Sequence, residues 1–197
     1  LGAAGFFLLP WYAVEDGFFA FEWRFGFPFD AESAPAVWQA ASHGKAWLWP
    51  LLLPLLAPLF VALRPRGDVL RANVLLGSGA LGLVLGLTQG FAFGPLGCTA
   101  DWLGALLGPS CGHQLGMGYG ALGVHLCFLL VASEGLSVRL FARPDAFVAG
   151  SLCLVAALIG LFVVYPVGII LLRAFDTDTG GFSVGVLAAN LASGRLW

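Results

Sequence analysis

The sequence has little charge. Only 10% of its 197 residues are charged, whereas an ordinary soluble domain carries about 25%, and hydrophobic residues make up 59%. The nine Lys and Arg residues and the eleven Asp and Glu residues leave a net charge of -2. They form no basic patch of the kind that phosphate binding requires. The composition argues against an ordinary soluble domain and gives no hint of a nucleic-acid partner.

Long segments of the chain also lack polar interruption. Five apolar stretches are each about as long as the roughly 20 residues that cross the hydrocarbon core of a bilayer. The first of them ends near residue 14, and the other four occupy residues 46–63, 72–93, 114–132 and 146–172. The last stretch has no polar face, unlike a helix on the surface of a soluble protein. The sequence therefore predicts an all-α fold, a polytopic membrane helical bundle with about five transmembrane helices.

Residues that carry chemistry are scarce. No Ser/His/Asp set or pair of carboxylates falls within a span, so we predict no catalytic residue, no bound cofactor and no enzyme activity. His113 and His125 lie on or near residues 114–132, and haem or metal ligation is conceivable. No carboxylate or cysteine accompanies the two histidines as a further ligand, so we predict no metal site. An interhelical hydrogen bond of histidine with Gln89 is the better interpretation.

Basic residues are concentrated in two short connections, and they predict the orientation. Five of the nine basic residues lie there: Arg64, Arg66, Arg71, Arg139 and Arg143. Short basic loops stay in the cytoplasm. We therefore expect a multi-pass protein of the bacterial inner membrane, with the N-terminus inside and the C-terminus of this chain outside.

Cysteines are few. Cys98 and Cys111 are separated by 12 residues and flank a loop on the expected outer, oxidising side, so a structural disulfide is possible. No Cys-x-x-Cys pair is present to indicate a redox centre. Cys127 and Cys153 lie within spans, where cysteine acts as a small apolar residue.

Glycine and proline are the abundant small and rigid residues. Gly82, Gly86 and Gly90 form two overlapping small-xxx-small units, which favour close helix packing. Residues 116–120, GMGYG, resemble a selectivity filter only weakly, and packing is the better interpretation. Pro54 and Pro58, together with Pro50, recur every four residues on one helix face and predict a kinked or curved helix, as does Pro166 later in the chain. The functional alternative for this proline face is a hinge or a widened cavity.

The end of the chain resembles a known family. It contains a Tyr-Pro pair in an apolar helix (Tyr165-Pro166), an Arg-Ala-Phe exit (Arg173 to Phe175) and a Gly-Gly-Phe-Ser segment at residues 180–183. These resemble the first core helix of the permease subunit of binding-protein-dependent ABC importers, especially the ferric-iron type. More faintly, residues 8–17 and 114–122 are similar to a four-span N-terminal extension found in some members.

The resemblance implies two parts. Residues 1–136 would form the four-span extension, and residues 146–197 would form the first core helix with an outer segment. The implied partners are a separate ATPase subunit, a periplasmic solute-binding protein and the lipid bilayer. The family's ATPase-coupling loop does not occur in this sequence, so we expect an N-terminal fragment of a longer permease.

Two alternatives remain open. One is a quinone-linked thiol/disulfide membrane oxidoreductase that uses Cys98 and Cys111, and the other is a structural membrane bundle. For the apolar end we predict a continuous helix over residues 147–175, loosened near Pro166 because proline cannot donate to the carbonyl of Phe162. A short interfacial helix should follow from Ser183, a candidate N-cap.

Overall fold

The computed structural model describes residues 1–12, 27–30, 33–94, 97–98, 116–140 and 145–173. Within these ranges the regular elements are helices and one antiparallel pair of two-residue strands, β1 (Phe93–Gly94) and β2 (Gly97–Cys98), with isolated bridges between Pro10 and Pro35 and between Tyr12 and Met117. The chain divides into two compact units, Leu1–Gly150 and Ser151–Trp197. The unit boundary falls a few residues after the basic connection between the two predicted parts.

Three helices in the described part of the chain are long and apolar enough to cross a membrane. They are α4 (Val69–Ala92), α6 (Tyr119–Leu140) and the stretch Ala146–Ile170. An all-α fold with long apolar helices was predicted, but with about five such helices. The difference lies in the first two predicted spans.

The first predicted span contains only a short helix. α1 (Gly2–Leu8) has seven residues and ends at Leu9, whose backbone is extended (φ -119°, ψ 150°). Leu9 precedes Pro10, and the proline ring disfavours helical backbone at the residue before it. A second short helix, α2 (Ala36–Ser42), begins after Pro35. The expectation that a helix continues to about residue 14 is therefore wrong.

The second predicted span is an apolar helix of mixed type. It consists of η2 (Ala46–Leu51), α3 (Leu52–Leu56) and η3 (Ala57–Val61), in which η2 and η3 are 3₁₀ helices. Pro50, Pro54 and Pro58 place one proline in or at the start of each segment. Each proline removes an i→i−4 hydrogen bond, and the tighter 3₁₀ turns supply i→i−3 bonds instead. The prolines thus divide the helix rather than produce one kink.

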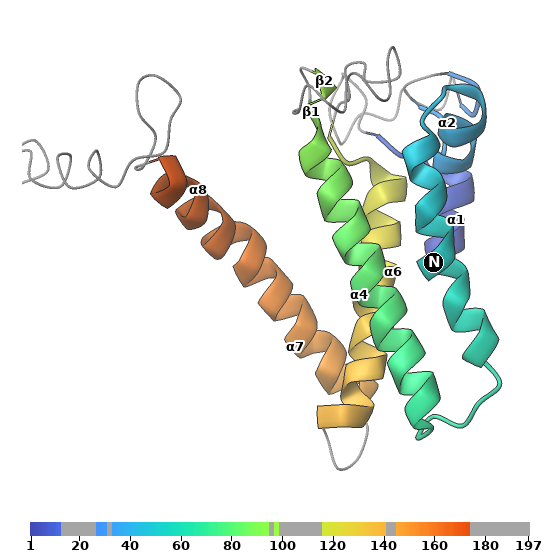
Figure 1. Ribbon diagram of the computed structural model, residues 1–197, viewed down its shortest axis with the longest axis vertical. Helices are drawn as coiled ribbons and strands as arrows, with labels where there is room; N and C mark the ends of the chain where they lie inside the picture. The colour runs from blue at the N-terminus through green and yellow to red at the C-terminus, as the bar shows by residue number, and fades with distance from the viewer. Residues whose placement is uncertain (13–26, 31–32, 95–96, 99–115, 141–144, 174–197) are drawn as a thin grey trace, which may run out of the picture. The chain divides into compact units, whose positions relative to one another are not determined.

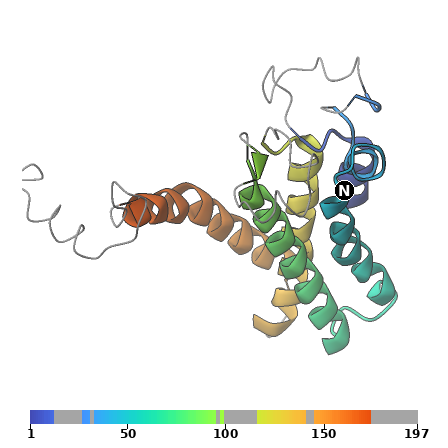
Figure 2. The same cartoon turned by 45° about the horizontal axis from the view of Figure 1, so that its top comes forward.

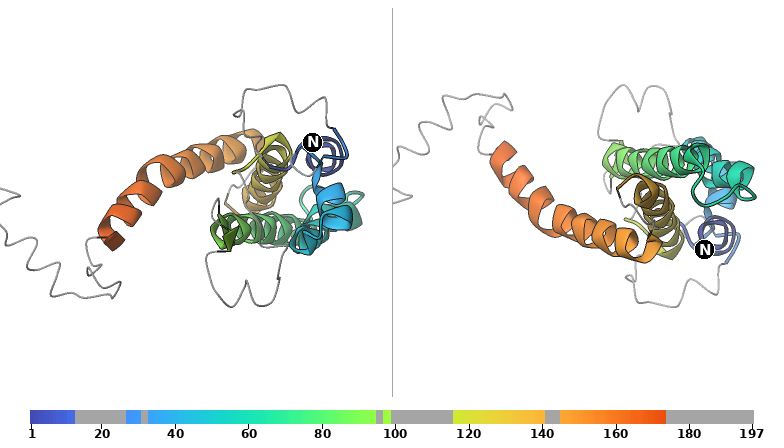
Figure 3. Two further views of the ribbon diagram at one scale, coloured as in Figure 1. Left: turned by 90° about the horizontal axis from the view of Figure 1, so that it is seen from above. Right: turned by 90° about the horizontal axis from the view of Figure 1, so that it is seen from below.

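The pair of α4 and α6 is the framework of the first unit. The two helices lie side by side in both orthogonal views (Figure 1; Figure 3), with α1 against α6 and α3 against α4. α4 begins earlier than predicted, at Val69, because Asp68 caps it: the Leu70 N–H donates to Asp68 Oδ1 at 2.9 Å. The basic connection therefore leads directly into the helix.

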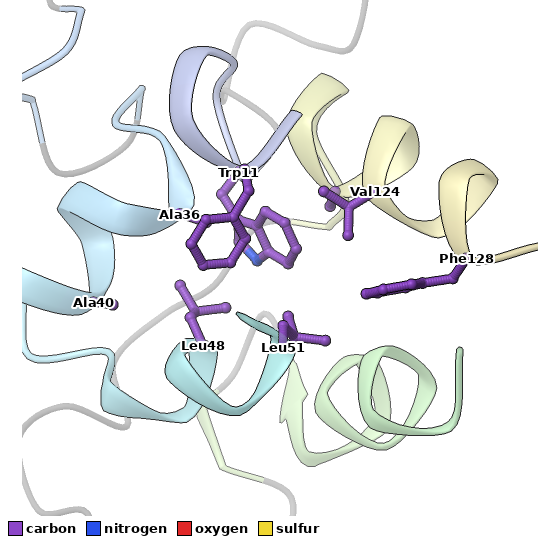
Figure 4. Packing of buried hydrophobic residues seen from close by; sticks show 9 residues of the cluster. Trp11, Ala36, Ala40, Leu48, Leu51, Val124 and Phe128 are labelled. Atoms are coloured by element: carbon purple, nitrogen blue, oxygen red, sulfur yellow. The ribbon is translucent and has the colours of Figure 1, made fainter. Parts of the chain in front are cut away.

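A hydrophobic core joins α1, α2, η2 and α6. Trp11, just after α1, lies over Leu48 and Leu51 of η2, and Phe128 of α6 closes one side (Figure 4). Phe6 of α1 belongs to the same buried cluster. Phe6 and Trp11 make an edge-to-face contact with ring centroids 5.8 Å apart. The short helices of this end gather around α4 and α6 in the tilted view (Figure 2). The small N-terminal helices are therefore held by aromatic packing rather than by their own length.

The described part of the second unit continues one helix in three segments. α7 (Ala146–Ile159) is followed by a π-type turn, η5 (Gly160–Val164), and by α8 (Tyr165–Arg173). The Tyr165 N–H donates to the carbonyl of Gly160, five residues earlier. Pro166 follows directly and has no N–H to offer Phe162. Loosening was expected near this proline, and the wide turn lies immediately before it. Phe175 and the predicted helix from Ser183 lie outside the described residues.

Candidate functional site

A glycine seam runs between α4 and α6. Gly79, Gly82 and Gly86 of α4 face α6, and Gly135 of α6 faces α4. A Cβ atom added to Gly79 would lie 2.5 Å from the backbone nitrogen of Ala132, and one added to Gly135 would lie 2.5 Å from the backbone nitrogen of Leu76. Real side chains do not approach so closely, so the two backbones meet only because these positions are glycine.

Two side chains of α6 fill the notches left by the seam. The Phe128 ring lies over Gly82, with ring carbons 2.5 Å from the position of an added Cβ. The His125 imidazole occupies the space over Gly86, where an added Cβ would overlap it. Gly90 has nothing within 4 Å of an added Cβ. Of the three glycines singled out from the sequence, the structure places Gly82 and Gly86 in the seam, and Gly79 takes the place of Gly90.

His125 is held inside this seam by its own helix. Its Nδ1 lies 2.6 Å from the carbonyl oxygen of Ala121, one turn earlier. Its Nε2 is buried and has no hydrogen-bond partner among the described residues. The Trp11 ring lies 6.3 Å from the imidazole, and the Phe128 ring 6.5 Å, centroid to centroid. An apolar, aromatic setting of this kind holds the ring sterically.

The predicted hydrogen bond between His125 and Gln89 does not form. Gln89 Nε2 donates instead to the backbone carbonyl of Trp47, at 2.6 Å. The carbonyl of Trp47 lies in the 3₁₀ segment η2, and the residue three positions later, which would donate to it in a 3₁₀ turn, is Pro50, which has no N–H. Gln89 therefore ties α4 to the proline-rich helix, while the histidine remains with α6.

An aromatic cluster of Tyr12, Lys45, Trp47 and Phe93 surrounds this glutamine bond. Trp47 stacks on Phe93 with centroids 4.2 Å apart and donates from Nε1 to the Tyr12 hydroxyl at 3.3 Å. Lys45 Nζ lies 4.2 Å from the centre of the Tyr12 ring, a cation–π contact. Burial raises the pKa of Tyr12 to about 12, against the lowering effect of the Trp47 bond. The cluster fastens the chain after α1, the start of η2 and the end of α4 together.

The opposite end of the α4–α6 pair carries ion pairs. Arg71 of α4 donates to Glu134 Oε1 of α6 at 2.6 Å and to the carbonyl of Arg64 at 2.9 Å. Arg139 of α6 donates to the side-chain oxygen of Asn73. These bonds link the basic connection to both helices, so the arginines that predicted the orientation also join the two helix ends.

Several residues singled out from the sequence have no site built around them. Pro54 is fully buried in α3, and Pro58 lies in the first turn of η3. Gly118 and Gly120 donate their backbone N–H groups to the carbonyls of Trp11 and Pro10. The GMGYG segment thus pairs with the chain after α1, as the packing interpretation requires.

Other predicted residues lie beyond what the structure describes. Cys111 and His113 are outside the described residues, and of Cys98 only the backbone, in β2, is described. The disulfide therefore stays a prediction. Within the described ranges, no group of three His, Cys, Asp or Glu side chains is placed to hold a metal ion.

No protein-family model matches this chain, and neither a curated protein nor a solved structure matches it.

Proposed function

We propose that this chain is the N-terminal part of the membrane permease of an ABC importer for ferric iron or a similar small solute. The observation that carries the proposal is the helix from Ala146 to Arg173. It holds the Tyr165-Pro166 pair that resembles the first core helix of such permeases, and a π-type turn lies directly before this pair. π-type turns within helices are frequent at functional positions, where they re-aim the residues that follow.

The surface of this helix supports the same role. In its most apolar stretch only 6% of the residues are buried, compared with 28% in α4 and 33% in α6. Phe162 and Ile170 are exposed by 71% and 68%. A helix with so little of its surface covered suits a place among lipids and the other transmembrane helices of a permease core.

The seam between α4 and α6 supports a scaffold role for the first unit. Glycine notches and the Arg71–Glu134 ion pair fasten its two helices together. In the proposal, residues 1–136 brace the permease in the bacterial inner membrane, with the Arg64–Arg71 connection in the cytoplasm. ATP is then bound by a separate subunit, and the solute is delivered by a periplasmic binding protein.

Uptake by cells tests the proposal. The gene for this chain is deleted in its own host, and uptake of radioactive ferric iron is compared with uptake of an amino acid. We expect a loss of iron uptake alone, restored by the intact gene, and co-purification of an ATPase with the tagged protein. Unchanged iron uptake together with the absence of an ATPase partner would contradict the proposal. A matched Cys98→Ser and Cys111→Ser pair, assayed for quinone reduction, tests the oxidoreductase alternative.

A further inference from the structure

Four arginines gather where α4 begins and α6 ends. Arg64 and Arg66 lie in the connection before α4, Arg71 lies in its first turn, and Arg139 lies in the last turn of α6. Arg71 joins the two groups through its bonds to the Arg64 carbonyl and to Glu134. The four side chains therefore belong to one end of one helix pair.

Exposed apolar residues precede and follow the connection that carries Arg64 and Arg66. We call these residues, Phe60, Leu63 and Val69, the apolar collar. Leu63, directly before Arg64, is fully exposed, and Phe60, four residues before Arg64, is 88% exposed. Immediately after Asp68, Val69 is 65% exposed. Bare aromatic and aliphatic side chains directly beside guanidinium groups are typical of a segment at the boundary between hydrocarbon and headgroups, where the apolar part enters lipid and the cations stay at the surface. The collar thus sets the arginines at the depth of lipid phosphates.

The arginines keep donors for a further partner. A guanidinium has five N–H donors. Arg64 uses Nη1 on Asp68, at 2.9 Å, and no bond from the Arg66 side chain is found within the described part of the chain. Fixed intramolecular bonds orient Arg64 and Arg71 without using all of their N–H groups. An arginine held in this way is prepared for two-point binding of a phosphate.

The local charge is positive. Two carboxylates, Asp68 and Glu134, pair with arginines of the cluster, and Asp145 lies at the start of α7. Counting all three against the four arginines leaves one positive charge in excess, and Arg143 adds another in the sequence. Asp145 is engaged at the start of α7, where its side chain accepts from the N–H groups of Phe147 and Val148. Asp68 and Glu134 are each paired with an arginine. All three of these described carboxylates are thus engaged by other groups than Arg66.

We propose that this cluster, Arg64, Arg66, Arg71 and Arg139, binds the phosphate of an anionic phospholipid headgroup. The apolar collar decides for a lipid over a soluble anion, because only a lipid satisfies both the exposed Phe60 and Leu63 and the guanidinium groups beside them. The lipid fastens the start of α4 to the end of α6 at the membrane surface. The inference is independent of the transported solute and of the proposed permease activity.

Lipid retention measures this binding. The purified chain is exchanged from a neutral detergent into mixed micelles that contain either phosphatidylglycerol or phosphatidylcholine, and bound lipid is counted by native mass spectrometry. We expect retained phosphatidylglycerol and little phosphatidylcholine. Arg66→Gln should lower the phosphatidylglycerol affinity about fivefold, which corresponds to about 1 kcal/mol for one cation near a membrane surface. Because Arg66 has no described partner within the protein, the variant should fold.

Two further variants sharpen the measurement. Arg66→Lys keeps the charge and loses the planar fork, so it should recover only part of the affinity. Lys45→Gln removes one cation from the opposite end of the helix pair and should leave lipid retention unchanged. Equal retention of the two lipids, an equal loss in Lys45→Gln and Arg66→Gln, or complete displacement of the lipid by inorganic phosphate would each overturn the proposal.

Discussion

The α4–α6 pair and the helix from Ala146 to Arg173 are both apolar and long, yet they are built differently. The pair is joined by glycine notches, by a half-buried histidine and by an interhelical ion pair. The other helix has few buried residues, and its one irregularity is a turn next to a proline. Apolar side chains alone do not hold helices together in lipid, because lipid is as apolar as leucine. Backbone approach and polar bonds are what distinguish a fixed pair of helices from an exposed one.

The largest expected effect comes from filling a notch in the seam. Gly86→Leu should lower the free energy of unfolding of the first unit by about 3 kcal/mol, the upper part of the usual range for overpacking. The cause is direct overlap with the His125 imidazole and the backbone separation that follows. Thermal unfolding of the purified protein in detergent measures the loss.

Gly90→Leu is the matched control for this substitution. It places the same side chain on the same helix, one turn later, where an added Cβ has nothing within 4 Å. We expect unchanged or slightly higher stability, since leucine is the better helix former by somewhat less than 1 kcal/mol. Equal losses for both substitutions would mean that the seam does not depend on the notch at Gly86.

The next effect comes from the ion pair between the helices. Glu134→Gln should lower the stability of the first unit by about 1 kcal/mol, because Arg71 then keeps a weaker, neutral partner. The Arg71 side chain is 16% exposed, and Glu134 is 37% exposed, so solvent screens part of the attraction. Chemical denaturation at low and high salt measures the contribution of this ion pair to stability, which should decrease as the salt concentration rises.

The exposed pair of Arg64 and Asp68 provides the comparison for this ion pair. Arg64→Gln breaks a pair within one connection and should change stability by less than Glu134→Gln does. If the two substitutions cost the same, the ion pair across the helices adds nothing specific to the α4–α6 framework.

Much of the helical architecture was predictable from composition and spacing. The predicted span 72–93 nearly coincides with α4, Val69–Ala92, whereas α6, Tyr119–Leu140, begins five residues later and ends eight residues later than the predicted span 114–132. Small-xxx-small spacing pointed to the correct face of α4 at Gly82 and Gly86. It could not tell Gly79 from Gly90, because that depends on where α6 crosses, and a single sequence does not contain the crossing point.

The first two predicted spans show that hydropathy alone does not predict where a helix ends or changes type. Leu9-Pro10 ends α1, and the prolines of residues 46–61 impose 3₁₀ turns, although both stretches are as apolar as a span. The bond between Gln89 and the Trp47 carbonyl was not predictable, because its acceptor is a backbone atom that carries no sequence signal. Residue type identifies donors well and backbone acceptors poorly.

A smaller effect on stability should come from Asp68, the N-cap of α4, and this effect should depend on pH. The hydrogen bond and charge of Arg64, with the Leu70 N–H, hold the pKa of Asp68 below its usual 3.8. A lowered pKa in the folded state stabilises the fold above pH 3.8, and this contribution is lost as the pH falls below that value. Asp68→Asn should remove this acid-dependent part, measured by unfolding from pH 6 to pH 2. An unaltered acid profile in the variant would assign it to other carboxylates.

The smallest effect on the first unit should come from Pro166→Ala in the second. Alanine restores an N–H at position 166, so the carbonyl of Phe162 regains a partner and the π-type turn at Gly160–Val164 can return to regular α-helix. Amide hydrogen exchange over residues 160–166 should slow, because closed i→i−4 bonds protect better than a wide turn. The unfolding midpoint of the first unit should stay the same, since its seam, core and ion pairs contain no residue of this helix beyond Gly150.

Gly168→Ala, a matched change two residues later where an added Cβ has nothing within 4 Å, controls for helix propensity alone. If Gly168→Ala slows exchange at residues 160–166 as much as Pro166→Ala does, the turn does not originate from the proline. A shift of the first unit's midpoint by Pro166→Ala would mean that the two apolar regions unfold together, and the contrast between a fixed pair and an exposed helix would fail.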